Sequence, residues 1–498
     1  MKHKKRLTTL FLIFISLISL NAQQISGHIQ DIHEAPIPYA TIQIGDRNGV
    51  LSNGEGDFSI LIPTHLKDSI MKISFMGYET FEVAVSEIEN NHTYTLIEQV
   101  TELGEVLVSN KQLTPLEIVN KMIEMAPSNY VTENINQTFF IRNTNKSKLE
   151  DLELELNKLT DLDRKERKKL NEEIEDFTKS YKNSNFEFFD EYYGKFFTYK
   201  DSSKIQIKKA VLLKNNDKDI NSEKLTTKVV DLLTKYLDTT ATYKVKSGMF
   251  KMEDSITTKE FLVTENEKDS TSSTNFLRNQ LSYKYKSLNM FYENEDVDFF
   301  DKQNRYEYTL EGYTTINNEM AYIIRFVPRK GSALYYGKMY INVMDYALVR
   351  LDCQMLESEN LHNLNLKFLV GVHVKQDRIG ISWVFEKNSK GKYNLKFAKK
   401  EEGVYAYISR PIKFKKNKTN RSDDKSVFKI NFTFETNSFS ITEFYALENA
   451  IIDEAEFSKI ENQDSYKCIE LKKYDPNVWE GYNIIAPIES IKNYGLND

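Results

Sequence analysis

The sequence has few of the residues that usually carry metal, disulfide or nucleophilic chemistry. The 498 residues include two Cys and seven His, which is too few Cys for a disulfide-dense scaffold or a four-Cys zinc site. None of the His begins an H-x-x-E or H-E-x-x-H pattern, and no G-x-S-x-G nucleophile elbow is present. We therefore predict no catalytic, cofactor-binding or metal-binding residues, no cofactor, and a protein that is not an enzyme.

Proline, glycine and positive charge are also scarce. The chain has 9 Pro and 18 Gly against 29 Tyr and 30 Phe, which excludes collagen-like and low-complexity classes and favours β-sheet. Hydrophobic residues make up 40%, so the chain can build cores. The formal net charge of -6 argues against nucleic acid as a partner and against a basic surface for anionic lipid headgroups.

Long apolar runs are absent except at the start. A basic stretch, Lys2 to Arg6, precedes the 14 uncharged residues Leu7 to Leu20 and the small residue Ala22. This pattern predicts a signal peptide over residues 1–22 and an exported chain in the periplasm or associated with the outer membrane. The run is shorter than the roughly 20 residues of a transmembrane helix. The alternative is an uncleaved anchor, and we expect no transmembrane span in the mature chain.

Residues 23–108 show apolar residues at every second position, as in Phe58, Ile60 and Ile62, with turn residues between such runs. This spacing predicts about seven short strands in a β-sandwich. Asn53, Glu55 and Asp57 in one turn could offer oxygen ligands to calcium, but a solvated turn is the favoured interpretation.

Four motifs in this region resemble one family. They are Ile25-Ser26-Gly27-His28-Ile29, Ala35-Pro36-Ile37-Pro38-Tyr39-Ala40-Thr41-Ile42, Ser52-Asn53-Gly54-Glu55-Gly56-Asp57-Phe58 and Ile73-Ser74-Phe75-Met76-Gly77-Tyr78. In this order they resemble the carboxypeptidase-regulatory-like β-sandwich found at the start of exported proteins of Bacteroidetes-type bacteria. Glu105-Val106-Leu107-Val108 resembles its closing strand. The resemblance implies a transthyretin-like, non-catalytic module.

Two helical segments are predicted next. Residues 109–127 form a linker helix, in which Thr114 caps, Pro115 occupies the first turn, Glu117 completes a capping box and Pro127 ends the helix. Residues 147–182 form a helical hairpin insertion, or one long helix, that projects from the body. This prediction depends on apolar residues three or four apart, namely Leu149, Leu152, Leu156, Leu159, Leu170, Ile174, Phe177 and Tyr181.

The remainder, residues 128–498, is predicted to be a large antiparallel curved β-sheet domain. Its strand succession over about residues 300–410 resembles the half-barrel of lipoprotein-carrier-like proteins, which implies a concave apolar surface. The fold class is therefore mainly β: a seven-stranded sandwich, then a curved sheet with a helical insertion. The predicted apolar ligand surface comprises Tyr322, Ile324, Phe326, Tyr340, Ile341 and Trp383.

The late segment around Trp479 and Tyr482 is predicted either to anchor a partner or to pack the end of the chain against the sheet. Whether Cys353 and Cys468 pair is left open. The predicted function is a non-catalytic envelope protein with a binding or scaffold role, whose partner is a lipid or other apolar ligand or an envelope protein. The alternatives are a hydrolase with an unrecognised carboxylate or Ser site, and a structural surface-assembly protein.

Overall fold

The computed structural model of the chain forms two compact units. It describes residues 23–45, 48–99, 113–160, 163–214, 241–247, 250–257, 271–286, 288, 297–316, 319–417 and 427–496. Unit 1 comprises residues 1–110, 312–321 and 474–498, and unit 2 comprises residues 111–311 and 322–473. The predicted signal peptide and the predicted closing strand Glu105–Val108 lie outside the described residues.

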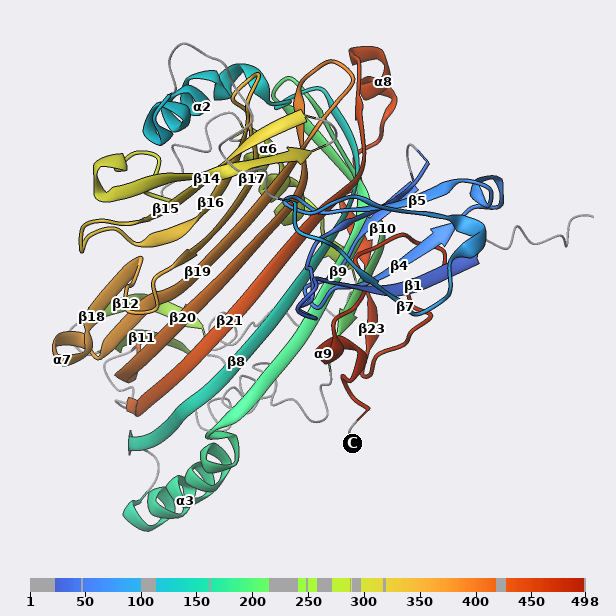
Figure 1. The fold of residues 1–498 in the computed structure, drawn as a ribbon. Helices are drawn as coiled ribbons and strands as arrows, with labels where there is room; N and C mark the ends of the chain where they lie inside the picture. The colour runs from blue at the N-terminus through green and yellow to red at the C-terminus, as the bar shows by residue number, and fades with distance from the viewer. Residues whose placement is uncertain are drawn as a thin grey trace, which may run out of the picture. The chain divides into compact units, whose positions relative to one another are not determined.

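Unit 1 is built on two small sheets that pack face to face, shown in blue in Figure 1. One sheet has the order β4 (Asp57–Ile62), β1 (Gln23–Gln30) and β7 (His92–Thr95). The other has the order β3 (Asn48–Leu51), β2 (Thr41–Ile44), β5 (Ile70–Ser74) and β6 (Phe81–Ala84). The alternate apolar residues predicted from the sequence, among them Phe58, Ile60 and Ile62, are at most 3% exposed in the core between the sheets. The predicted seven-stranded sandwich is confirmed.

The end of the chain also belongs to unit 1, whereas the sequence placed residues 474–498 in the large β domain. Asn483 accepts a hydrogen bond from the backbone N–H of Leu61 at 2.8 Å, and Lys492 of α9 (Glu489–Lys492) lies 2.8 Å from Asp57. Burial raises the pKa of Asp57, but hydrogen bonds from Lys492 and His28 outweigh it and hold that pKa below its ordinary value. The turn that could have held calcium therefore fastens the C-terminal segment instead.

Most of unit 2 is one large sheet. Its strands run in the order β14 (Tyr306–Ile316), β15 (Glu319–Pro328), β16 (Tyr335–Asn342), β17 (Leu348–Met355), β19 (Val372–Lys387), β20 (Tyr393–Lys416), β21 (Val427–Ile451), β8 (Ile135–Leu159), β9 (Ser184–Tyr199), β10 (Ser202–Leu213) and β23 (Ile469–Leu471). β18 (His362–Leu366) pairs with β19, and β11 (Thr242–Ser247) pairs with β20 and with β12 (Phe250–Thr257). The sheet is mixed rather than purely antiparallel, because β10 and β23 are parallel.

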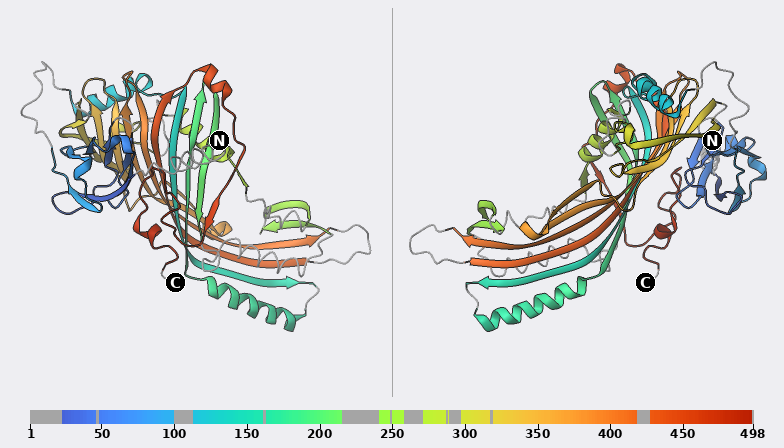
Figure 2. Two further views of the ribbon diagram at one scale, coloured as in Figure 1. Left: turned by 90° about the vertical axis from the view of Figure 1, so that its right-hand side faces the viewer. Right: turned by 60° about the vertical axis from the view of Figure 1, so that its left-hand side comes forward.

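The long strands β8, β20 and β21 bend strongly along their length (Figure 2). We call the part nearer residues 444 and 141 the proximal half and the part nearer residues 428 and 159 the distal half. Helix α6 (Asn275–Lys286) closes the proximal half on one face. Its buried residues Leu277, Leu281 and Tyr285 recur at helical spacing, and the Tyr285 ring stacks on Phe196 at 5.8 Å.

The described residues also form several shorter elements. They are β13 (Thr271–Ser273), which pairs with β22 (Ser465–Lys467), the helices α7 (Lys367–Val370) and α8 (Glu454–Lys459), and the 3-10 turns η1 (Thr64–Leu66), η2 (Val85–Glu87) and η4 (Gln303–Arg305).

The linker helix is present as α2 (Pro115–Asn129), with the predicted capping box between Thr114 and Glu117. It continues through Pro127 instead of ending before it. Pro127 lies in the last turn, where its missing N–H removes a single hydrogen bond and the helix ends two residues later.

The predicted helical hairpin at 147–182 is wrong in its first half. Residues up to Leu159 continue strand β8, and only α3 (Arg164–Tyr181) is helical. The prediction failed because β-bulges break the two-residue period. The pairing of β8 with β21 shifts register between Glu435 and Thr436 and between Lys429 and Ile430. Each bulge adds a residue, so leucines three apart remain on one face of the strand.

Candidate functional site

Strand pairing assembles a continuous apolar surface on the distal half of the large sheet. Leu366, Val372, Ile408, Phe434 and Leu152 stand directly opposite one another across the five strands β18, β19, β20, β21 and β8. Residues opposite one another in a ladder point to the same face. Every position in this row is apolar, so one face of the sheet is hydrophobic across its full width.

The neighbouring rows extend this surface, which we call the apolar pad. Its further apolar members, in the same register, are Leu364, Val374, Ala406, Leu149, Phe432, Leu154, Ile412, Ile430, Leu156, Phe414, Phe428 and Leu159. Two positions in these rows are polar: Thr436, and Arg410, which donates to the Ser247 carbonyl at 2.8 Å. From residue 436 to residue 428 of β21 the pad is about 26 Å long at about 3.3 Å per residue. Leu170 and Ile174 of α3, with Tyr243 and Val245 of β11, pack against its outer end.

The pad is only partly covered. The leucines of β8 are buried, whereas Ile408, Phe434, Phe432 and Val372 are half-buried, and Leu364 at the edge is 54% exposed. The opposite face of the same strands is polar. There the Tyr405 hydroxyl donates to Glu435 at 2.6 Å. Strands with one polar and one half-open apolar face can hold an apolar molecule on the latter.

A row of polar side chains lies on the same face, six residues of β21 or about 20 Å from the last row of the pad. Lys400, Thr442, Asn143 and Asp190 are opposite one another across β20, β21, β8 and β9. We call them the polar belt. Thr442 donates to Asn143 at 2.8 Å, and Asn143 donates to Oδ1 of Asp190 at 3.2 Å. The belt and the pad together make this face amphipathic along the strands.

Asp190 has an unused acceptor. Its Oδ1 also accepts from Tyr192 at 3.3 Å, while Oδ2 is buried and, among the described residues, has no hydrogen-bond partner. Burial raises the pKa of Asp190 to about 6, against the pull of its two hydrogen bonds. Beside the belt, Lys284 of α6 lies 4.7 Å from the Phe444 ring centroid, and burial together with the Lys400 charge lowers its pKa to about 8. A buried oxygen without a donor indicates room for a hydrogen-bonding group.

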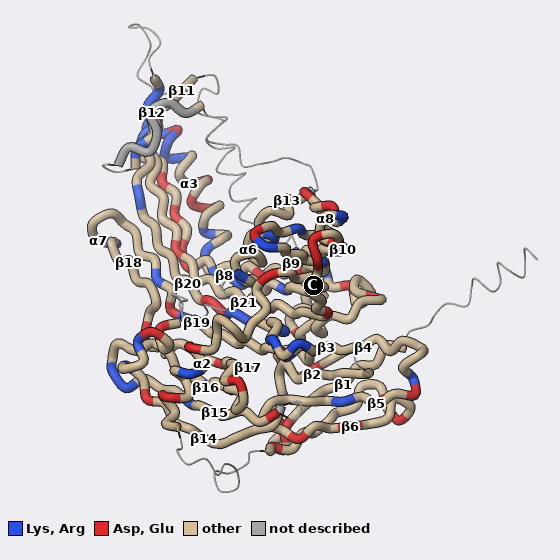
Figure 3. The backbone as a smooth tube through the Cα atoms, turned by 90° about the horizontal axis from the view of Figure 1, so that it is seen from above, with Lys and Arg blue, Asp and Glu red and all other residues tan. Residues whose placement is uncertain are grey.

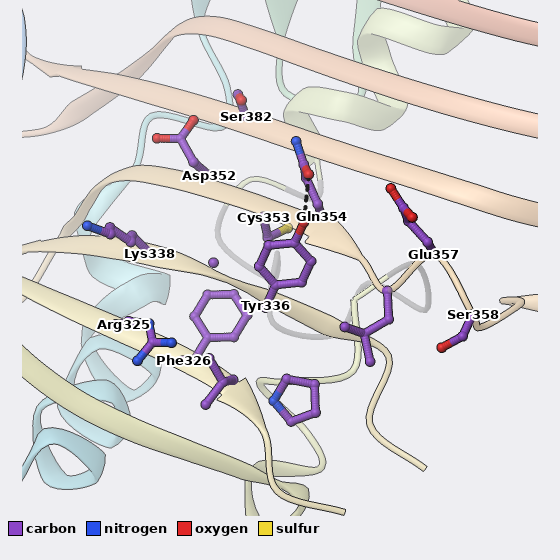
Figure 4. Close-up of a pocket in the computed structure, with 14 residues that line it drawn as sticks. Arg325, Phe326, Tyr336, Lys338, Asp352, Cys353, Gln354, Glu357, Ser358 and Ser382 are labelled. Atoms are coloured by element: carbon purple, nitrogen blue, oxygen red, sulfur yellow. Dashed lines mark hydrogen bonds between the residues drawn. The ribbon is translucent and has the colours of Figure 1, made fainter. Parts of the chain in front are cut away.

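The opposite face of β15, β16 and β17 carries a groove of about 950 Å³ (Figure 4). Tyr336 spans its floor and donates to Gln354 at 2.9 Å. Its charges pair with neighbours: Arg350 lies 2.5 Å from Asp352, and Lys338 lies 2.8 Å from Glu311. Because Arg325, Lys338 and Asp352 already have counter-charges, the groove offers weaker recognition than the pad and the belt.

The predicted ligand surface does not gather in one exposed place. Tyr322, Ile324, Phe326 and Ile341 are 7% exposed or less, in the core of the sheet. Tyr340 and Trp383 are half-buried. Tyr340 is opposite Arg350, and Trp383 is opposite Leu351. Successive residues of a strand point to opposite faces, so Tyr340 and Trp383 lie on opposite sides of the sheet.

The other predicted residues are not members of the pad. Trp479 is 9% exposed in unit 1, with its ring 5.7 Å from that of Tyr482, which is half-buried. Cys353 and Cys468 are both free thiols. Among the described residues no cluster of three His, Cys, Asp or Glu could hold a metal ion, and no helix there is long and apolar enough to cross a membrane.

The sequence did contain a signal for the pad. Leu152, Leu154 and Leu156 alternate with acidic residues, as do Phe428, Ile430, Phe432 and Phe434 with polar ones. Period two over this length predicts a strand with one apolar face. Leu154 does not fit the helical spacing of Leu149, Leu152 and Leu156, and it is the residue that decides between the two periods.

Comparison with known proteins gives one domain assignment and a distant structural similarity. No curated protein matches the chain. A LolA superfamily protein from Nitrosomonas europaea shares 8% identity over 70% of this chain and 99% of its own, with a TM-score of 0.17. MucB, solved in complex with MucA(peri), shares 7% identity over 64% of this chain and 92% of its own, with a TM-score of 0.16. Residues 25–108 match the family model of the CarboxypepD_reg-like domain.

Proposed function

We propose that the chain is a non-catalytic, exported envelope protein that binds an amphipathic lipid on the apolar pad of its large sheet. The observation that carries the proposal is the row Leu366, Val372, Ile408, Phe434 and Leu152, which is apolar across five strands and in large part half-exposed. Burying an acyl chain there removes apolar surface on both partners from water, which favours binding by about 25 cal/mol per Å².

The polar belt supports an amphiphile rather than a pure hydrocarbon. A long-chain ligand with its headgroup at Asn143, Thr442 and Asp190 brings the end of its tail to the nearest rows of the pad, about 20 Å away. A hydroxyl or ammonium group there donates to the buried Oδ2 of Asp190, which none of the described residues satisfies. Such a contact relieves the cost of an unsatisfied buried acceptor, about 1–3 kcal/mol.

The test compares two double variants on the same pair of strands. Leu364 is opposite Val374, and Asn363 is opposite Lys375, but the two pairs face opposite sides of the sheet. In the chain from Gln23 onward, we expect Leu364→Asp with Val374→Asp to weaken binding of a fluorescent palmitic acid at least tenfold. Asn363→Asp with Lys375→Asp should bind as the unaltered chain does.

The headgroup contact has its own readout. Asp190→Ala should weaken binding of a fluorescent hexadecylamine probe, whose ammonium group can donate to Oδ2, but leave binding of pyrene, which has no headgroup, unchanged. Equal affinities for both double variants would contradict the pad as the lipid site. Native mass spectrometry of the chain isolated from an envelope fraction, showing a bare mass and no lipid, would move the assignment to a protein partner.

A further inference from the structure

The β18–β19 hairpin ends in an apolar tip, helix α7, at the side of the distal half of the sheet (Figures 1 and 3). Phe368 is 100% exposed, more than any other large apolar side chain among the described residues, and Leu369 is 74% exposed. The tip has a defined backbone. Gly371 adopts φ +69°, and its carbonyl accepts from the N–H of Ser409 at 2.7 Å. The two side chains are therefore held outward by a specific turn.

The strands beside the tip are strongly basic. Residues 241–247, 362–376 and 403–416 together contain eight Lys and Arg and no Asp or Glu. Lys367 lies 3.7 Å from the Tyr407 ring centroid, and on the neighbouring strands Lys413 and Lys415 stand opposite Lys246 and Lys244. The lysines at positions 244, 246, 413 and 415 are exposed, and Figure 3 shows blue segments at the end that carries β11.

We propose that this tip docks the protein on an anionic lipid bilayer. Phe368 and Leu369 enter the boundary between headgroups and acyl chains, and the lysines beside them contact lipid phosphates. An apolar side chain inserted at this depth together with cations at the surface is the combination that gives stable interfacial binding. The net charge of -6 predicted no basic surface, but net charge is a whole-chain sum and the cations here are concentrated on three paired segments.

The shape of the tip favours lipid over protein as the occupant. A stable protein interface buries about 800 Å² on each partner around a well-packed centre. Here two side chains project from a one-turn helix, and no described residue forms a hollow around them. A fluid bilayer accommodates such a projection without a complementary pocket. The inference does not depend on the lipid site on the pad, because docking requires no bound ligand.

The experiment measures flotation of the chain from Gln23 onward with vesicles of phosphatidylethanolamine and phosphatidylglycerol, 3:1, and with phosphatidylcholine alone. The start at Gln23 removes the apolar run Leu7–Leu20, which would itself partition into lipid. We expect binding to the anionic vesicles that weakens as salt rises. Phe368→Ser with Leu369→Ser should reduce it at least tenfold, and the combined changes Lys244→Gln, Lys246→Gln, Lys413→Gln and Lys415→Gln should remove most of its salt dependence.

Two controls separate insertion from general stickiness and from ligand binding. Met344 on the β16–β17 turn is 80% exposed, so Met344→Ser removes an equally exposed apolar side chain elsewhere in unit 2 and should leave flotation unchanged. The Phe368 and Leu369 variant should bind the palmitic acid probe normally. In the Phe368→Trp variant, brominated lipids should quench added fluorescence. Unchanged flotation of the double variant, or an equal loss with Met344→Ser, would overturn the proposal.

Discussion

The two halves of the long strands differ in what covers them. On one face of the proximal half, Phe444 and Phe139 are at most 1% exposed, because α6 lays Tyr285 over them. On the same face of the distal half, Phe434 and Phe432 are half-buried. In both halves β21 places phenylalanine on this face, at Phe444 and at Phe434 and Phe432. For these phenylalanines, the difference in burial follows from the covering helix.

This difference indicates which part of the sheet contributes more to the free energy of unfolding and which part keeps apolar surface open. Closed apolar surface contributes to the free energy of unfolding in proportion to the area removed from water. A half-open row of aromatic residues contributes less to the free energy of unfolding, although it contains as many apolar residues. The distal half therefore keeps a surface whose further burial is available to a ligand, while the proximal half supplies the rigid base that holds it in register.

The largest expected loss of stability follows from removing an aromatic side chain in the proximal half. Phe444→Ala leaves a cavity between Phe139 and Tyr285 that the sheet cannot close, so we expect a loss of about 4 kcal/mol in the free energy of unfolding. The matched change Phe434→Ala, on the same strand and face in the distal half, should cost about 1 kcal/mol. Urea denaturation of both variants measures the difference. Equal losses would mean that the distal half is as well packed as the proximal half.

Sequence reasoning succeeded where local signals were unbroken and failed where packing intervened. The sandwich of unit 1 followed from period two, turn residues and four motifs, and the capping box at Thr114 and Glu117 placed the start of α2. In β8 the bulges near Glu150 and Asn157 produce the spacing of a helix, so the sequence predicts a helix where the structure has a strand. No local rule marks a bulge inside a charged segment.

The residues predicted for the apolar ligand surface do not form the pad. The sequence indicated a curved sheet with an apolar surface, yet Ile324 and Phe326 from that prediction are fully buried. The most apolar strands are those that are buried from both sides, which removes them from any ligand. The half-exposed row through Ile408 and Phe434 depends on pairing between strands far apart in sequence, which periodicity cannot supply.

A second prediction concerns the boundary between the two halves, where Asp190 lies. The pKa of Asp190 is raised by burial to about 6, above the ordinary value of 3.8. The folded chain therefore binds a proton more readily than the unfolded chain, and its stability falls as the pH rises from about 4 to about 6 and is constant above that. Because the side chain is in part open to solvent, we expect this loss to be about 1–2 kcal/mol.

Asp190→Asn removes the titration and keeps the oxygen that accepts from Asn143 and Tyr192. Urea unfolding at pH 4.5 and pH 8 should show that the unaltered chain loses stability between the two values by more than the variant does. A parallel pH dependence of the two chains would show that another group is responsible. In that case Asp190 is solvated like a surface residue, and burial does not raise its pKa.

The smallest effect is expected at the open edge of the distal half. There Asn171 of α3 accepts from the backbone N–H of Leu156 at 2.8 Å and donates to its carbonyl at 3.1 Å. β9 begins opposite Leu149, so the Asn171 amide supplies the hydrogen bonds that a neighbouring strand would give Leu156. Unpaired backbone groups at a sheet edge can pair with strands of other chains. Asn171→Ala should cost about 1 kcal/mol and speed hydrogen exchange at the Leu156 amide. Glu172→Ala, on the exposed side of α3, should change neither. If the Leu156 amide exchanged at the same rate in both variants, the distal edge would be protected by the sheet itself, and the proximal half would extend further along β8 than its covering helix indicates.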